Sequence, residues 1–197
     1  MLLDHILNKK EKGIAAYHEA GHGLVAASLS RAGEVRKISI VARGLAAGYT
    51  LKMPREERKL KQKSELLAEL AILLGGYTAE KIKFKEITTG AADDLKRASS
   101  LARELVKKYG MSSLGPIVFG EKQEFVFLPT DSPETINYSE TTAAMIDKEV
   151  MQFINDAERK AFEVLQEKEQ ILEKLAQTLI EKETIEKEEF EKIVQGG

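Results

Sequence analysis

The chain of 197 residues contains no cysteine. Disulfide bonds, thiol catalysis and thiolate metal sites are therefore excluded, and any metal ligands must be histidine, aspartate or glutamate. The absence of cysteine also fits a reducing compartment. Long apolar runs are missing too: residues 66–76 form one of the longest, well short of the roughly 20 residues that span a bilayer. With no signal-peptide pattern at the N-terminus, we expect the chain as given to be soluble.

Neither sign of charge is in excess, because 30 lysines and arginines nearly balance 32 aspartates and glutamates. No basic stripe with interleaved aromatics is present, and the lysines of the C-terminal third alternate with glutamates, as on solvated helix faces. We therefore expect no nucleic-acid partner. The hydrophobic fraction of 43% is typical of a globular chain, and the length suffices for one sizeable domain with a real core.

Helical periodicity dominates the sequence. We predict a buried helix over residues 11–29, a helix capped by Ser64 that runs to Leu74, and a helix over residues 92–109 that stops at Gly110. One long helix or two are expected over residues 139–181, followed by a short final helix capped by Thr184. The residues that fall on one side of the first helix, at steps of three and four, are Ile14, Tyr17, His18, Gly21, Val25 and Ser28.

Extended segments are few and short. Residues 35–41 and 48–53 alternate as strands do and predict a hairpin, and residues 117–119 with 125–128 predict a second one. The expected fold is mainly α (α+β), with a small β-sheet or hairpins and a long C-terminal helical region.

The sequence His-Glu-Ala-Gly-His at residues 18–22 is the strongest chemical signal. Positions i and i+4 of a helix share one face about 6 Å apart, so His18 and His22 can bind one zinc ion while Glu19 points to the open coordination position. The alternative is a pair of ordinary histidines on a buried helix. The spacing on a helix with a buried side favours the metal, with Glu19 as the general base.

The third ligand is predicted to be a carboxylate, because Ser28 stands where a longer histidine motif has its third histidine. The remaining histidine, His5, lies near the N-terminus, where a surface position is common. The candidate carboxylates are Glu80, Glu86, Asp93 and Asp94.

Helical phase separates these candidates. Asp94 continues an apolar stripe, whereas Asp93 aligns with polar residues. A carboxylate on a buried stripe is costly unless it is paired or bound to metal, which favours Asp94, and Glu80 remains its rival. The stripe consists of Ala98, Leu101, Ala102, Leu105 and Tyr109.

Short motifs in the same order along the chain resemble the peptidase domain of the FtsH family of membrane-anchored, ATP-dependent zinc proteases. The motifs are residues 12–23, Gly48-Tyr49-Thr50, Leu74-Gly75-Gly76 with Ala79-Glu80, Thr89-Gly90-Ala91 with Asp94-Leu95, Tyr109-Gly110-Met111-Ser112, Leu114-Gly115-Pro116 and Tyr138-Ser139-Glu140. The chain departs from the family pattern at Ala42, Tyr77-Thr78 and Asp93, which are neighbours of the predicted site.

The resemblance implies a zincin-like zinc endopeptidase, with His18, His22 and Asp94 as ligands of one zinc ion and Glu19 as the base. Residues 1–133 would form the zinc-binding catalytic part and residues 134–197 the C-terminal helical part of one domain. The extended segment Gly48-Tyr49-Thr50 is a candidate substrate-binding edge. The competing hypothesis is a non-catalytic assembly module stabilised by a closed zinc site.

The resemblance also implies partners outside the chain. No G-x-x-x-x-G-K-[ST] loop is present, so ATP would act only through a separate motor module. The parent protein would be a membrane-anchored homohexamer with an AAA ATPase domain and with this domain on the cytoplasmic side. Its substrates would be polypeptides from unfolded membrane and soluble proteins.

Overall fold

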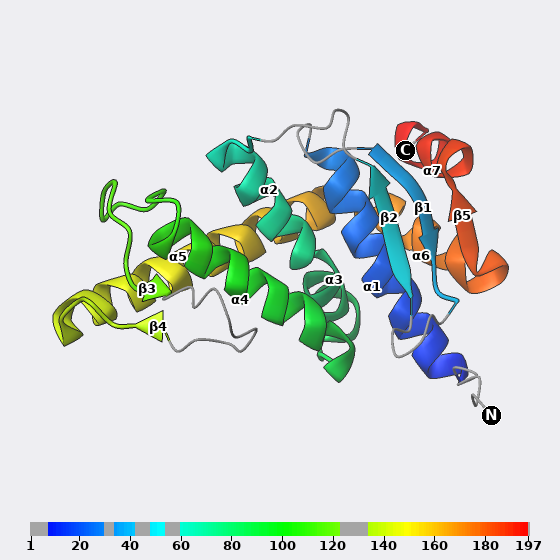
Figure 1. Ribbon diagram of the computed structural model, residues 1–197. Helices are drawn as coiled ribbons and strands as arrows, with labels where there is room; N and C mark the ends of the chain where they lie inside the picture. Colours follow the sequence, from blue (N-terminus) through cyan, green and yellow to red (C-terminus); the bar gives the residue numbers. More distant parts are fainter. Residues whose placement is uncertain (1–7, 30–33, 42–47, 54–59, 123–133, 197) are drawn as a thin grey trace, which may run out of the picture.

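The computed structural model describes residues 8–29, 34–41, 48–53, 60–122 and 134–196. Helices dominate it, and a small sheet lies against one end of the helical body (Figure 1). The mainly α fold with a small sheet is confirmed. The helices are α1 (Lys9–Ser28), α2 (Lys63–Leu73), α3 (Gly75–Phe84), the 3-10 turn η1 (Thr89–Ala91), α4 (Ala92–Lys107), α5 (Glu140–Glu167), α6 (Glu169–Lys182) and α7 (Lys187–Gln195). The strands are β1 (Glu34–Ser39), β2 (Tyr49–Met53), β3 (Glu121–Lys122), β4 (Glu134–Thr135) and β5 (Thr184–Glu186).

Helix α1 is the centre of the molecule. It begins at a capping box in which the Asn8 side chain accepts hydrogen bonds from the backbone N–H groups of Lys10 and Glu11, and the Glu11 carboxylate accepts one from the N–H of Asn8. Residues 15–26 are buried all round the helix, because α2, α3, α5, α6 and β1 all pack against it. The prediction of a buried helix is therefore confirmed, and over these residues the burial extends to all sides of the helix.

Helices α2 and α3 meet at a glycine pair. The α2 segment ends at Leu73 and α3 starts at Gly75, where the backbone comes so close to α1 that a Cβ on Gly21 would lie 2.5 Å from the Gly75 carbonyl oxygen. The glycine pair thus lets the backbones of α1 and α3 approach each other closely. Ser64 is not the N-cap, because Gln62 precedes the helix and its N–H donates to the Glu65 carboxylate.

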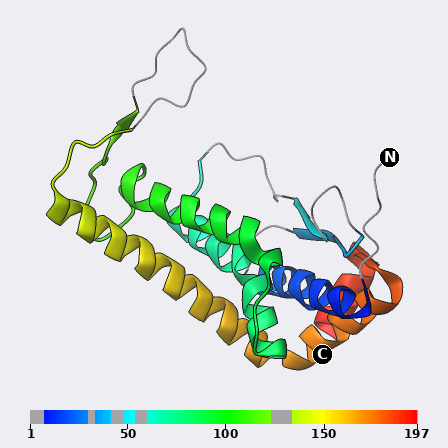
Figure 2. The ribbon, with the colours of Figure 1, turned by 90° about the horizontal axis from the view of Figure 1, so that it is seen from below.

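Helix α4 lies beside α2 and α5, and the long helix α5 runs along the part of the molecule formed by α2, α3 and α4 (Figure 2). The N-cap of α5 is Ser139, whose side chain accepts a hydrogen bond from the N–H of Thr142. Gly110 follows α4 with a φ of +59°, which a glycine adopts without strain. Of the one or two long helices expected over residues 139–181, the structure has two, α5 and α6.

The sheet has the order β2-β1-β5, with both pairs antiparallel. The predicted pairing of the first two strands is confirmed, but the third strand was not predicted. Thr184 lies in this strand, opposite Ser39, and is not a helix cap; α7 starts after Glu186. Residues 117–119 are not a strand, and their expected partner 125–128 lies outside the described residues; β3 pairs with β4 instead.

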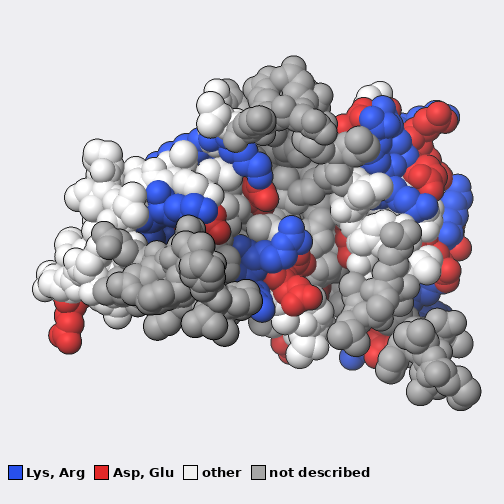
Figure 3. All heavy atoms as spheres, viewed as in Figure 1, with Lys and Arg blue, Asp and Glu red and all other residues white. Residues whose placement is uncertain are grey.

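Charged side chains of both signs are interspersed over the sheet and α7 on the face in Figure 3. Several form ion pairs between elements, such as Lys37 with Glu186 and Lys187 with Glu34. Such exposed pairs contribute little stability each. Within the part of the chain that the structure describes, no helix is long and apolar enough to span a bilayer. The division after residue 133 remains a prediction.

Candidate active site

The two histidines of the motif lie in the buried middle of α1, each 8% exposed. Their Nε2 atoms are 3.0 Å apart. Nδ1 of His18 contacts Oε1 of Glu80 at 2.7 Å, and Nδ1 of His22 contacts the backbone carbonyl oxygen of Ile72 at 2.6 Å. A carbonyl oxygen can only accept, so Nδ1 of His22 carries a proton, and the neutral ring presents a lone pair at Nε2.

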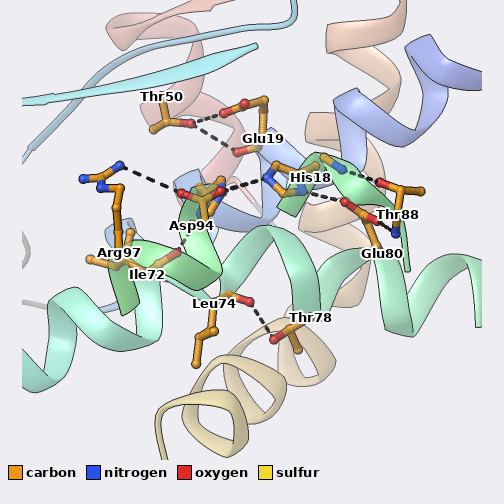
Figure 4. Close-up of polar contacts among 12 residues, drawn as sticks. His18, Glu19, Thr50, Ile72, Leu74, Thr78, Glu80, Thr88, Asp94 and Arg97 are labelled. Carbon is orange, nitrogen blue, oxygen red and sulfur yellow. Dashed lines mark hydrogen bonds and ion pairs between the residues drawn. The ribbon is translucent and has the colours of Figure 1, made fainter. Parts of the chain in front are cut away.

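Asp94, in the first turn of α4, completes the cluster. Its Oδ2 atom lies 3.2 Å from Nε2 of His18 and 3.0 Å from Nε2 of His22, so three potential ligand atoms lie within 4.8 Å of one another (Figure 4). Two imidazole nitrogens and a carboxylate oxygen at this separation require a shared cation, either a proton or a metal ion. The donor set and the three-ligand count suit zinc with an open fourth position.

Electrostatics in the cluster follow from these contacts. Burial lowers the pKa of His18, but hydrogen bonds to Asp94 and Glu80 outweigh it and raise the pKa to about 9. Burial raises the pKa of Asp94, but its hydrogen bonds to His18 and His22 prevail and hold the pKa well below the ordinary value. The guanidinium of Arg97, 3.9 Å from Oδ1 of Asp94, adds a further positive charge. Without a metal, the site therefore holds a proton on a histidine at neutral pH.

The other carboxylates considered lie elsewhere. Glu80 is fully buried on α3, but it contacts His18 on the side of the ring away from the cluster and accepts the N–H of Thr88 with its second oxygen. Burial raises the pKa of Glu80, while the His18 and Thr88 contacts bring it below the ordinary value. Glu86 and Asp93 are exposed. Glu80 is thus placed to orient the ring of His18 from its Nδ1 side.

Glu19 lies one residue after His18 and is 7% exposed. Its Oε2 atom accepts a hydrogen bond of 2.8 Å from the hydroxyl of Thr50 on β2. Burial raises the pKa of Glu19; nearby His22 and His18 and the Thr50 hydroxyl oppose this effect without cancelling it. A carboxyl group with a raised pKa beside a metal-ligand cluster is suited to transfer protons.

Three contacts of this site were not predicted. The Glu80–His18 pair and the Thr50–Glu19 pair join residues 62 and 31 positions apart, and the acceptor for His22 is a backbone carbonyl, which leaves no mark in a sequence. The predicted substrate segment Gly48-Tyr49-Thr50 is placed beside Glu19 at the start of β2. His5 lies outside the described residues.

Comparison with known proteins identifies the family. The model of peptidase family M41 matches residues 5–193. The chain belongs to peptidase family M41. This M41 chain is 45% identical over 190 residues to the ATP-dependent zinc metalloprotease FtsH of Caldicellulosiruptor bescii. The aligned region is 96% of the chain and 31% of that relative. It is 47% identical over 187 residues to the ATP-dependent zinc metalloprotease FtsH 1 of Sphaerobacter thermophilus. Here the aligned region is 94% of the chain and 29% of the relative.

These matches confirm the resemblance to the FtsH peptidase domain and the prediction of a protease domain. They do not favour the assembly-only alternative. The M41 chain spans about a third of the length of the curated relatives it matches.

Proposed function

We propose that this chain is a zinc-dependent endopeptidase domain that hydrolyses peptide bonds in unfolded polypeptides. The observation that carries the proposal is the convergence of His18, His22 and Asp94 on one point, with Glu19 buried on the same helix. Membership of a peptidase family and the zinc in the names of the relatives support it.

Zinc would be held by Nε2 of His18, Nε2 of His22 and a carboxylate oxygen of Asp94. When bound, the ion supplies Lewis-acid chemistry: it lowers the pKa of a water molecule to about 7 and polarises the scissile carbonyl. Glu80 and the Ile72 carbonyl hold the imidazoles from behind, since each contacts an Nδ1 atom. Such outer contacts fix ring orientation and make the ligands more basic.

Glu19 is the general base in this mechanism. Its carboxylate takes the proton of the attacking water and delivers it to the leaving amine, so one group serves as base and then as acid. The raised pKa of Glu19 suits this exchange, because a more basic carboxylate accepts the proton more readily. The low exposure of the group keeps competing solvent away.

Substrate would bind in extended form along β2. This strand is one of the two edge strands of the described three-stranded sheet. Gly48, Tyr49 and Thr50 lie at its start, where Thr50 contacts the catalytic base. Main-chain hydrogen bonds between strands are independent of side-chain identity. We therefore expect little sequence preference, as an unfolded-protein substrate requires.

The parent protein extends beyond this domain. In line with the ATP dependence in the names of the relatives and with their greater length, we assign it an AAA ATPase domain and a membrane anchor, with the peptidase domain on the cytoplasmic side of a homohexamer. ATP would then act only through the motor, which unfolds membrane and soluble proteins and delivers them.

The substitution Glu19→Gln tests the mechanism. Glutamine keeps the size of the side chain but cannot accept the proton, so cleavage of a short internally quenched peptide should fall by about a hundredfold or more, while zinc content by atomic absorption stays at one per chain. The matched control is Glu188→Gln, the same change at an exposed position on α7. Undiminished cleavage by the Glu19 variant would refute the proposal.

A further inference from the structure

The hydroxyl of Thr50 is joined to the carboxylate of Glu19. Oγ1 of Thr50 donates to Oε2 of Glu19 at 2.8 Å and lies 3.4 Å from the backbone oxygen of the same residue. Figure 4 shows the side chain of Thr50 directed at Glu19. A hydroxyl has one proton to donate, so the hydrogen bond goes to the nearer and charged acceptor, Oε2 of Glu19.

Gly48 packs beside the other oxygen of the same carboxylate. A Cβ built on Gly48 would lie 2.8 Å from Oε1 of Glu19 and 2.9 Å from its Cγ. The backbone of residue 48 therefore packs directly against the carboxylate, and a larger residue could not. Residues 48 and 50 thus contact the Glu19 carboxylate at both oxygens: Thr50 through a hydrogen bond to Oε2, and Gly48 through close packing beside Oε1.

Such support matters because the last torsion of a glutamate side chain is broad and nearly two-fold, so the plane of the carboxylate is not fixed by its own rotamer preference. A general base must present a particular oxygen to the water within hydrogen-bonding distance. A misplacement of about 1 Å at a reacting group costs about a hundredfold in rate.

We propose that Thr50 is a positioning residue for the general base: it engages Oε2 of Glu19 and thereby presents Oε1 for proton transfer. Among the described residues, no hydrogen bond to Oε1 competes with this role. Because Thr50 belongs to the strand that is proposed to bind substrate, the same backbone sets the base relative to the peptide to be cut. The inference rests on the proposed role of Glu19.

The test compares Thr50→Val, which keeps the shape and removes the hydroxyl, with Thr50→Ser, which keeps the hydroxyl. In the zinc-loaded chain cleaving a short quenched peptide, Thr50→Val should lower kcat about tenfold to a hundredfold with KM within about twofold and zinc still at one per chain. Thr50→Ser should restore most of kcat. The matched control is Thr141→Val, at an exposed position on α5.

Three results would overturn the inference: an unchanged kcat in Thr50→Val, a raised KM with kcat intact, which would place Thr50 on the substrate, or a serine variant as slow as the valine variant. If circular dichroism shows that Thr50→Val does not fold, Thr50→Ala takes its place in the same comparison. Full activity of Glu19→Gln would instead refute the proposed function itself, so the two failures are distinguishable.

Discussion

The contact between α1 and α3 gives a quantitative prediction for Gly21→Ala. The added Cβ would lie 2.5 Å from the Gly75 carbonyl oxygen and 2.7 Å from Cβ of Ala79. The first distance is about 0.9 Å short of the 3.4 Å at which ordinary contact begins. A backbone carbonyl cannot rotate away as a flexible side chain can, so the two helices must separate.

The cost can be worked from two opposing effects. Overpacking of a close-packed core costs about 1–3 kcal/mol, and a clash with backbone belongs at the upper end of that range. Alanine in place of glycine in a helix interior stabilises the helix by about 1 kcal/mol. We therefore expect Gly21→Ala to destabilise the fold by about 2 kcal/mol, which lowers Tm by about 4–8 °C for a chain of this size.

Gly13→Ala is the control in the same helix, because a Cβ there meets nothing within 4 Å. It should stabilise the fold by about 1 kcal/mol through helix propensity alone. Urea unfolding followed by circular dichroism, with EDTA present to remove any contribution from metal, measures both variants. If Gly21→Ala proves as stable as the unchanged chain or as Gly13→Ala, the close approach of α1 and α3 is refuted.

Two further predictions concern the metal site. Glu80→Gln should weaken zinc binding by about tenfold to a hundredfold, because it replaces the charged partner of Nδ1 of His18. Competition with a zinc chelator measures the zinc affinity of the variant. An unchanged affinity would contradict the orienting role of Glu80. Zinc uptake at pH 7.5 should release about one proton, because the metal-free site raises the pKa of His18 to about 9 and binding requires the neutral ring. Zinc affinity should therefore rise with pH until the pKa of His18 is passed. Calorimetry in buffers of different ionisation enthalpy should show the release of the proton. A binding enthalpy that does not depend on the buffer would contradict this prediction.

Helix positions were largely predictable because their signals are local. The 3.6-residue pattern and the cap at Ser139 determine the long C-terminal helices within a few neighbouring residues. Local signals also explain the errors. Ser64 has the chemistry of a cap, but Gln62 takes that position through its pairing with Glu65, and Thr184 lies in a strand whose partner is Ser39, far away in sequence.

The site divides in the same way. His18, Glu19 and His22 are predictable because one helical turn holds them, and Asp94 follows from the periodicity of its own helix, which buries Ala98 and Ala102. The contact of Glu80 with Nδ1 of His18 was not predicted, because Glu80 lies on a separate helix, α3, whose phase could not be judged from the sequence. The hydrogen bond between Thr50 and Glu19 was not predicted, because nothing in the sequence aligns β2 with Glu19; the assignment of Thr50 to a substrate-binding edge stays a prediction.

The glycines link stability to chemistry. Gly21 and Gly75 let α3 approach α1, and Gly76 faces the ring of His18 so closely that a Cβ there would lie 2.5 Å from Nε2. The same approach brings Glu80 to the other nitrogen of that ring. One helix contact both closes the core and orients His18, a proposed metal ligand. A larger residue at Gly21 should therefore displace Glu80 from His18 as it separates the helices. Stability and zinc affinity should then fall together in this variant, whereas Glu80→Gln should lower zinc affinity while the helix contact remains.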